Sequence, residues 1–300
     1  MNTITGKATW DPLAAPERMC HLLGEALPDF GLVQWQQATG STNADLGERI
    51  RSGQVSSLQT RPWLRGANLQ TAGKGRAGRA WANEPGQCLM FSVAMDSPVP
   101  IGALVGLPPV LGINAVLALR NLLGHAVQGR LTLKWPNDLL WDEAKLAGIL
   151  VETVKHPAKP EPIIVAGIGL NLAGAARLTA DMGRPIADWS QVSEANAATG
   201  QPDHDAVVLV ASISRAWSNA LNRFAEVGFG GFRADFESMD ALSGQAVAIM
   251  DLGAVLMEGV ACGCDESGKL LVQTAKGLSP VMVGDVSVRP ARVAPGRREP

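Results

Sequence analysis

The sequence predicts an α+β protein with a small all-β domain at its C-terminus. Apolar residues recur at helical spacing in segments such as 205–227, and these alternate with short strand-like runs such as 131–135. From about residue 242, short strands separated by glycine- and aspartate-containing turns replace the helical spacing. A chain of 300 residues, 46% of them hydrophobic, can bury a large core and a second, smaller one. We therefore expect one domain over residues 1–240 and a barrel or sandwich over 241–300.

The N-terminal part of the larger domain is expected to alternate between helices and strands. The expected elements are a helix over 17–27 that Pro28 ends, a strand over 32–37, a helix within 39–50 and a buried strand over 87–95. Ser41, Thr42 or Asn43 would cap the second helix, because a side-chain oxygen at that position accepts a hydrogen bond from a free amide of the first turn.

The middle of the larger domain is expected to bring two oppositely charged side chains together. Alternation in the strand 131–135 places Lys134 away from the core side of that strand. The residues that follow predict a hairpin with its turn near 142–144. Pairing across this hairpin brings Asp138 close to Lys145, so that a carboxylate and an ammonium share one end of the ribbon.

Two apolar segments contain residues that break regular structure. Residues 101–123 are apolar at helical spacing, but two central prolines should start or kink this helix, because proline lacks an amide donor. Residues 162–172 predict a buried strand that Gly167 and Gly169 interrupt. Glycine inside a strand indicates close approach by a ligand or by another backbone segment.

Composition and charge exclude several classes of protein. A formal net charge of -2 and a pI near 6.1 give no global field for nucleic acid, so any contact with a polyanion must be local. The chain has no apolar run of 18 residues and no cationic-then-apolar N-terminus, so we expect a cytoplasmic protein without membrane contact. The four cysteines are too few and too scattered for a disulfide framework or a metal site, and are expected to be reduced thiols.

The segment 73–81, GKGRAGRAW, is the most unusual local pattern. It places Lys74, Arg76 and Arg79 among glycines and alanines and ends on Trp81. It is not a nucleotide-binding P-loop, because no Lys-Ser or Lys-Thr follows its second glycine, and it does not lead into a helix as a dinucleotide fingerprint does. Its residues alone are compatible with an exposed loop, a phosphate-binding loop or a weak contact to RNA.

Five short motifs follow one another along the larger domain. They are STN at 41–43, QTAGKGRAGRAW at 70–81, KWPND at 134–138, KLAGILVE at 145–152 and GIGLN at 167–171. Each alone fits a plain structural role, but together they resemble the motifs of bacterial biotin protein ligases, which attach biotin to biotin-dependent carboxylases. The resemblance implies a class II synthetase-like catalytic domain, with a mixed sheet flanked by helices, and a small SH3-like C-terminal domain.

The sequence departs from the pattern of this family in two places. Lys74 stands where the family loop has its first arginine, which keeps the charge but loses the bidentate guanidinium fork. Only about 40 residues precede Ser41. We therefore expect a form that lacks the N-terminal DNA-binding domain of the regulatory members and binds no specific DNA.

The resemblance also implies a role for individual residues. Those implied to surround biotin, with the first four around its ureido ring, are Ser41, Thr42, Asn43, Gln70, Trp81, Gly167 and Ile168. Gly148 and Leu150 are implied to line the same ribbon as Lys145. Those implied to close over the acyl-adenylate are Gly73, Lys74, Gly75 and Arg76. The remaining cofactor-binding positions, with the two asparagines towards the nucleotide, are Lys134, Asn137 and Asn171. The implied catalytic residues are Lys145, Asp138 and Arg76.

The implied reaction has two steps. The carboxylate of biotin attacks the α-phosphate of ATP, pyrophosphate leaves, and a lysine amine of a biotin carboxyl carrier protein then captures the acyl group. Lys74, Arg76 and Lys145 can neutralise the carboxylate and phosphate charges in a partly dry site. Mg²⁺ is expected to enter with the ATP phosphates, with Asp138 as its candidate protein ligand. The enzyme is expected to be a monomer or a homodimer.

Two other functions are weaker alternatives. A lipoate or octanoate ligase shares this fold, but its loop has an Arg-Arg pair before three glycines and a downstream histidine, and this chain has neither. A non-catalytic RNA-binding protein could use the same basic loop. However, the chain lacks the basic stripe interleaved with aromatic residues that single-strand binding needs, and it has no tyrosine.

Overall fold

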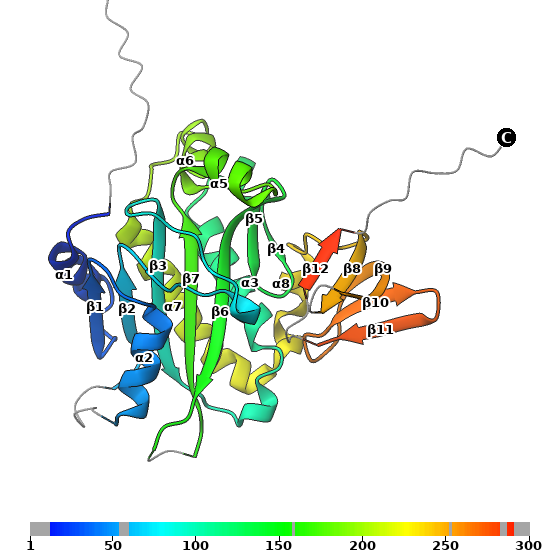
Figure 1. The fold of residues 1–300 in the computed structure, drawn as a ribbon, viewed down its shortest axis with the longest axis horizontal. Coiled ribbons are helices and arrows are strands. Elements are labelled where there is room, and N and C mark those ends of the chain that lie inside the picture. Colours follow the sequence, from blue (N-terminus) through cyan, green and yellow to red (C-terminus); the bar gives the residue numbers. More distant parts are fainter. Residues whose placement is uncertain (1–12, 54–59, 158–159, 252–253, 283–286, 291–300) are drawn as a thin grey trace, which may run out of the picture.

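The computed structural model describes residues 13–53, 60–157, 160–251, 254–282 and 287–290, which fold into two parts (Figure 1). A seven-stranded sheet with helices forms the larger part, and a five-stranded sheet forms the C-terminal part. No helix among the described residues is long and apolar enough to cross a lipid bilayer.

The helices and strands have the following bounds. The α-helices are α1 Pro16–Ala26, α2 Thr42–Arg51, α3 Leu107–Arg120, α4 His125–Gln128, α5 Ala175–Met182, α6 Trp189–Ala197, α7 Ala206–Val227 and α8 Arg233–Glu237. The 3-10 helices are η1 Arg76–Gly78, η2 Ile101–Ala103 and η3 Phe229–Phe232. The strands of the large sheet are β1 Leu32–Gln36, β2 Trp63–Ala67, β3 Cys88–Asp96, β4 Leu131–Lys134, β5 Asp138–Trp141, β6 Ala144–Val154 and β7 Ile163–Asn171. Those of the C-terminal sheet are β8 Ala246–Asp251, β9 Ala254–Cys264, β10 Leu270–Thr274, β11 Gly277–Val281 and β12 Ser287–Pro290.

The large sheet is mixed and has the order β1-β2-β3-β7-β6-β5-β4. Its first pair, β1 and β2, is parallel, and every other pair of neighbours is antiparallel. The C-terminal sheet has the order β11-β10-β9-β8-β12, and all its pairs are antiparallel. These two sheets confirm the predicted α+β class with a mixed sheet and a small all-β part.

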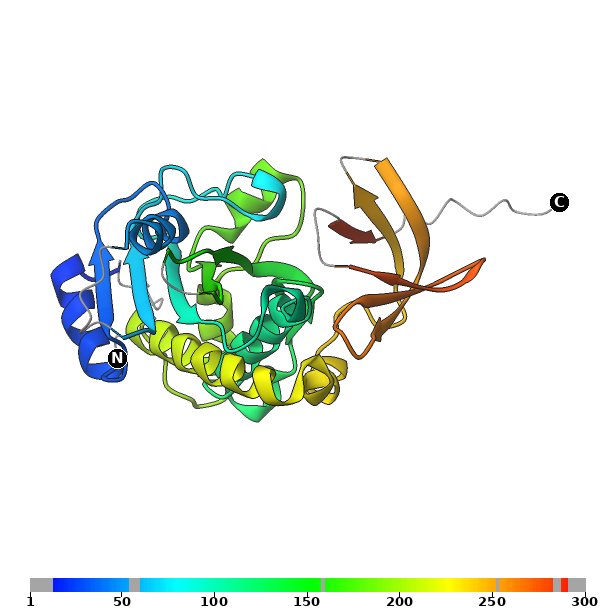
Figure 2. The ribbon, with the colours of Figure 1, turned by 90° about the horizontal axis from the view of Figure 1, so that it is seen from below.

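Two long helices cover one face of the large sheet. Figure 2 shows α3 and α7 together on this face, with α2 on the opposite face. The ring of Phe91 on β3 lies 6.1 Å from the ring of Trp217 on α7, and the Trp217 indole N–H donates to the Leu111 carbonyl on α3 at 2.9 Å. Because these helices fill one face, a ligand can reach the middle of the sheet only from the face that carries α2.

Most of the expected elements form within a few residues of their predicted bounds. Helix α2 begins after Ser41, whose side chain accepts a hydrogen bond from the Ala44 amide. Helix α3 begins at Leu107 with the two prolines in its first turn, where the missing amide donors cost no helical hydrogen bond. The apolar run 281–289 predicts one strand, of which Val281 ends β11 and residues 287–289 lie in β12, while residues 283–286 lie outside the described residues.

The C-terminal sheet is joined to the large sheet at β4. The Trp135 indole N–H donates to the Gly268 carbonyl at 3.0 Å. Residues 238–245, called here the connector, link α8 to β8. Within the connector, the Ala241 amide donates to the Leu133 carbonyl, and the Leu133 amide donates to the Met239 carbonyl. Gly268 has φ +83°, and a Cβ there would lie 2.9 Å from both Phe229 and the backbone of Gly106. A side chain at Gly268 would therefore separate the two parts.

The connector also contains a buried carboxyl group, and it predicts a pH effect on stability. Burial raises the pKa of Asp240 from 3.8 to about 6, although the Leu242 amide donates to its Oδ1 and partly opposes the shift. Among the described residues its Oδ2 has no hydrogen-bond partner. Because the folded-state pKa is raised, the favourable contribution of the neutral acid is complete below about pH 4 and is lost as the pH rises through about 6.

Asp240→Asn is therefore expected to remove part of this pH dependence. The amide cannot ionise and its oxygen can still accept from Leu242. Between pH 4.5 and pH 7.5, the free energy of unfolding should change by on the order of 2 kcal/mol less than in the parent, measured by urea titration at both pH values. Asp29→Asn, at an exposed position, is the control and should behave as the parent. An unchanged pH profile in Asp240→Asn would contradict the assignment.

Candidate active site

The candidate site lies on the open face of the large sheet, over β6 and β7. Two pairs of residues define its floor, since Gly148 is paired with Gly169 and Leu150 is paired with Gly167. The N-terminus of α2 lies at one end of this floor, and the β5–β6 hairpin lies at the other. The predicted motifs, which are far apart in the sequence, therefore meet on one surface.

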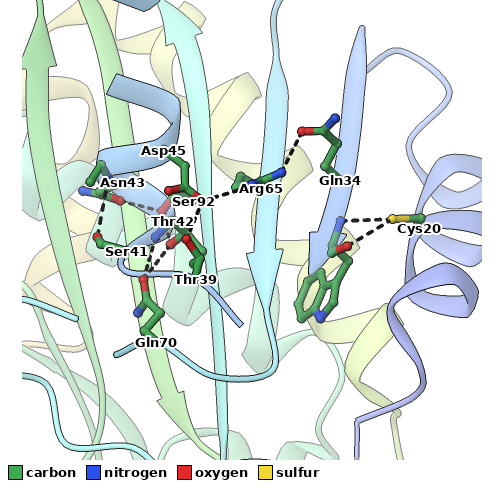
Figure 3. A network of polar contacts seen from close by, with 12 residues as sticks. Cys20, Gln34, Thr39, Ser41, Thr42, Asn43, Asp45, Arg65, Gln70 and Ser92 are labelled. Carbon is green, nitrogen blue, oxygen red and sulfur yellow. Dashed lines mark hydrogen bonds and ion pairs between the residues drawn. The ribbon is translucent and has the colours of Figure 1, made fainter. Parts of the chain in front are cut away.

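A chain of polar side chains lies at the N-terminus of α2 (Figure 3). The Thr42 amide donates to Gln70 Oε1 at 2.7 Å, and Thr42 Oγ1 lies 2.7 Å from Ser92 Oγ. Ser92 Oγ donates to Asn43 Oδ1 at 2.5 Å, and Asn43 Nδ2 donates to Glu152 Oε2 at 2.7 Å. These groups offer both donors and acceptors at the end of a partly buried surface, which suits a small, polar ring.

Two glycines let this chain and the floor approach each other. A Cβ at Gly167 would lie 2.2 Å from Asn43 Oδ1, so α2 can sit on β7 only because no side chain intervenes. Ile168, the next residue, has its side chain in the core and can present only backbone to the site. At Gly169 a Cβ would lie 2.4 Å from the ring of Trp81.

An ion pair next to α2 holds the chain that leads into it (Figure 3). Asp45 Oδ2 accepts hydrogen bonds from Thr39 Oγ1 at 2.8 Å and from Arg65 Nε at 3.0 Å. Arg65 also donates to Gln34 Oε1 at 2.8 Å. Together these contacts tie β1, β2 and the first turn of α2, and they fix the segment that carries the polar side chains.

Residues 73–81, called here the basic loop, form a compact turn above the floor. The Trp81 amide donates to the Gly73 carbonyl at 2.9 Å, and the Gly75 amide donates to the Arg79 carbonyl at 2.7 Å. Lys74 is exposed, whereas Arg76 is half-buried and its Nη1 donates to Asn137 Oδ1 at 3.1 Å. The loop therefore directs Arg76 towards the β4–β5 turn.

Trp81 lies flat against the floor at the end of the basic loop. A Cβ at Gly148 would lie 3.2 Å from its ring, so the paired glycines at 148 and 169 form a trough for the indole. Lys145 Nζ lies 5.5 Å from the ring centroid, a distance at which an ammonium is attracted to an aromatic face. The indole N–H donates to Cys88 Sγ at 3.3 Å. Trp81 thus lies between the basic loop and the floor, and its place in a ligand pocket stays a prediction.

Lys145 and Asp138 meet as the sequence predicts. Lys145 Nζ lies 2.6 Å from Asp138 Oδ1, with 15% and 21% of the two side chains exposed. Asp138 is paired in register with Gly148, not with Lys145. A bulge between Leu139 and Leu140 shifts the register, and it turns Lys145 to the same side as Asp138.

The asparagines expected near the nucleotide take different places. Asn137 Nδ2 donates to the Ile149 carbonyl at 2.6 Å, and its Oδ1 faces Arg76. Asn171 is 5% exposed and donates to the carbonyls of Lys145 and Ala187 at 3.3 and 3.0 Å. Asn171 thus holds the backbone of Lys145 from below. Lys134 is half-buried on β4 and is paired in register with Asp138.

Several residues of the site carry no motif in the sequence. Ser92 joins the polar chain, Asp45 and Arg65 hold α2, and Cys88 contacts Trp81. Glu152, which also joins the polar chain, is the last residue of the motif at 145–152, but no role was implied for it. Ser92 had a signal, since it is a hydroxyl inside an apolar strand. The others depend on which strands are neighbours. No group of three potential metal-ligating side chains occurs among the residues that the structure describes.

Sequence comparisons match both parts of the chain. The biotin/lipoate A/B protein ligase family matches residues 38–171, and the biotin protein ligase C terminal domain matches residues 242–289. The bifunctional ligase/repressor BirA of Escherichia coli is 31% identical over 264 residues, which cover 88% of this chain and 76% of that protein. The biotin--[acetyl-CoA-carboxylase] ligase of Paracoccus denitrificans is 31% identical, over 79% of this chain and 97% of that protein.

Solved structures show the same fold. The biotin protein ligase from Aquifex aeolicus, solved in complex with biotin and ATP, superposes with a TM-score of 0.70 at 24% identity. The match covers 87% of this chain and the whole of that one. A biotin protein ligase from Leishmania major, solved in complex with biotinyl-5-AMP, superposes with a TM-score of 0.55 at 21% identity over 83% of this chain.

Proposed function

Because the chain belongs to the biotin/lipoate A/B protein ligase family, we propose that it activates biotin with ATP and transfers it to a carrier protein. The product of the first step is biotinyl-5'-AMP, and the acceptor is a lysine of a biotin carboxyl carrier protein. The observation that carries this proposal is the position of Lys145, whose Nζ lies against Asp138 and over the Trp81 ring that ends the basic loop. The relatives favour this function over a lipoate ligase or an RNA-binding protein.

Biotin would lie along the floor with its ureido ring at α2. Thr42, Asn43, Gln70 and Ser92 supply donors and acceptors for the ring, because their mutual contacts can be exchanged for contacts with it. Asn43 and Ser92 fill the space above Gly167, so the bicyclic head would lie next to these side chains, beside Leu150. The valeryl chain would then point towards Lys145 and run beside Trp81, whose ring contacts the floor at Gly169.

The first step joins two anions. One carboxylate oxygen of biotin attacks the α-phosphorus of ATP, a P–O bond forms, and the bond to the departing pyrophosphate breaks. Lys145 would contact the oxygens on which charge is redistributed, and Arg76, with Lys74 nearby, would neutralise the phosphate. In the second step the amine of the carrier lysine attacks the acyl carbon and AMP leaves. Asp138 can accept the proton that this amine must lose.

Asp138 is also the proposed protein ligand of Mg²⁺. Asp138 is a single carboxylate that is already paired with Lys145. The described residues contain no group of three side chains that could hold a metal ion by themselves. This fits a metal that enters with the ATP phosphates and keeps several waters. When bound, the ion would neutralise phosphate charge.

The remaining expectations follow from the same proposal. We take residues 1–240 as the catalytic domain and residues 241–300 as an SH3-like domain. Lys134, Asn137 and Asn171 would lie on the nucleotide side of the site. A cytoplasmic enzyme that is a monomer or a homodimer is consistent with a soluble substrate and carrier.

Exchange of labelled pyrophosphate into ATP tests the function directly. The parent enzyme should catalyse this exchange when biotin and Mg²⁺ are present, because adenylation is reversible. Biotin-dependent transfer to a purified carrier domain tests the second step. No exchange at saturating biotin and ATP would rule out the proposed activity.

Arg76→Gly should form biotinyl-adenylate but release it faster. Closing a glycine-rich loop costs ordering entropy, and a charged contact to the adenylate offsets that cost. Its loss should raise the adenylate off-rate by about tenfold or more. The variant should therefore biotinylate serum albumin that is incubated with it, ATP and biotin, as read by blotting. Arg79→Gly, an exposed position in the same loop, is the control. Unlabelled albumin, despite normal adenylate formation, would show that Arg76 does not hold the loop.

A further inference from the structure

The contact between Trp81 and Cys88 links the basic loop to the interior of the sheet. Cys88 is the first residue of β3, and only 2% of it is exposed. Its sulfur accepts from the Trp81 indole N–H at 3.3 Å and also receives a hydrogen bond from the Leu170 backbone. Three neighbouring strands, β3, β7 and β6, therefore determine where the indole lies.

The position of the ring in turn determines two features of the site. The Trp81 amide closes the basic loop by donating to Gly73, so a rotation of the residue would move the end of the loop. Lys145 Nζ lies over the same ring. The glycine trough accepts a flat ring but does not choose its orientation, because it offers no polar partner. The sulfur supplies that choice, since an indole N–H requires a partner when it is covered.

We propose that Cys88 is a positioning residue, whose sulfur holds Trp81 in the trough and thereby keeps the basic loop closed over the acyl-adenylate. This inference rests on the proposed function, because it names what retains the intermediate of that reaction. Cys88 is 2% exposed and lies against the indole, so its role would be to position Trp81 and not to contact a ligand.

The Cys88 thiol is also expected to be unreactive at neutral pH, as a thiol close to a mixed anhydride should be. Burial raises the pKa of its thiol to about 12, and the hydrogen bond from Trp81 opposes this shift only in part. At neutral pH the group is therefore an SH, which is a poor nucleophile. The indole covers it, so the adenylate is not diverted to a thioester.

A double-mutant cycle on the adenylate off-rate tests the proposal. Cys88→Ala removes the acceptor, and Trp81→Phe keeps a ring but removes the donor. Each should raise the off-rate by about tenfold, and the double variant should be no faster than either single one, because both remove the same hydrogen bond. Cys88→Ser retains an acceptor and should stay within about threefold of the parent. Cys262→Ala, an exposed thiol on β9, should match the parent.

Two results would overturn the proposal. They are an unchanged off-rate in Cys88→Ala, and multiplicative effects of the two single changes in the double variant. A loss of thermal stability with no change in off-rate would mean that Cys88 only fills the core. Circular dichroism of each variant shows whether it folds. If Cys88→Ala does not fold, the off-rate of Cys88→Ser is compared with that of Trp81→Phe instead.

A second readout needs no ligand and separates this inference from the proposed function. In the ligand-free enzyme, iodoacetamide should alkylate Cys88 about tenfold faster in Trp81→Phe than in the parent, as followed by peptide mass spectrometry. If the parent shows no biotin-dependent exchange but the two alkylation rates differ, the proposed function is wrong and the contact between Cys88 and Trp81 is supported. Equal alkylation rates would refute the contact.

Discussion

Lys145→Ala is expected to lower the rate of biotin adenylation by about 10²-fold or more. The ammonium is held 2.6 Å from Asp138 at the place where the carboxylate and the α-phosphate would meet. Its charge stabilises oxygens whose charge changes during attack, so most of its effect should fall on the transition state. Asn171 fixes the backbone of Lys145, and therefore the loss should be specific to the missing ammonium.

Single-turnover formation of biotinyl-adenylate, measured at saturating biotin and ATP, checks this result. Lys134→Ala should lose much less activity, because Lys134 lies on β4, two strands away from β6, which carries Lys145 and Gly148. Lys276→Ala, in the turn between β10 and β11, should behave as the parent. Equal losses in the variants at 134 and 145 would mean that the reacting lysine has been misassigned.

The enzyme is expected to prefer biotin to lipoate and octanoate by about 10⁴ in kcat/KM for pyrophosphate exchange. Thr42, Gln70 and Ser92 form the polar end of the floor, at α2. An acid without a ureido ring would bury these groups, while their hydrogen bonds to the ring remain unmade. Discrimination by hydrogen bonds to a missing group is far larger than discrimination by a methylene.

The three acids can be compared in the same exchange assay. Thr42→Val removes a hydroxyl but keeps the shape of the side chain. It should lower kcat/KM for biotin and leave kcat/KM for octanoate nearly unchanged, so the preference for biotin should fall. Comparable exchange with lipoate and biotin in the parent would be inconsistent with a ureido pocket at α2.

The regular elements of the large sheet could be predicted because their patterns are local. Helix α7 and strand β7 have clear apolar spacing, and the prolines fixed the start of α3. The sequence pattern does not predict strand β2, because Arg65 and Gly66 interrupt its short apolar run. It predicts the C-terminal strands in type but not β11, because Pro280 lies within that strand.

The candidate site was predictable only in part. The hairpin brought Lys145 to Asp138 by its length alone, but the bulge that turns Lys145 could not be read from the sequence. The motif of the basic loop was visible, whereas its contact with Cys88 was not, because the pattern does not say which residue of β3 lies under Trp81. The roles implied for the site residues stay predictions until the variants are measured.

The joint at β4 has a consequence for how the molecule responds to proteases. Residues 239–241 lie against Leu133 through one parallel backbone bridge, and Met239 and Leu242 are almost completely buried. A protease needs an extended, accessible segment, and this connector offers its backbone to the sheet instead. The boundary that is obvious in the sequence is therefore not a cleavage site. The hydrogen bond from Trp135 to the Gly268 carbonyl also ties the C-terminal sheet to the large sheet, so we expect the two parts to resist separation.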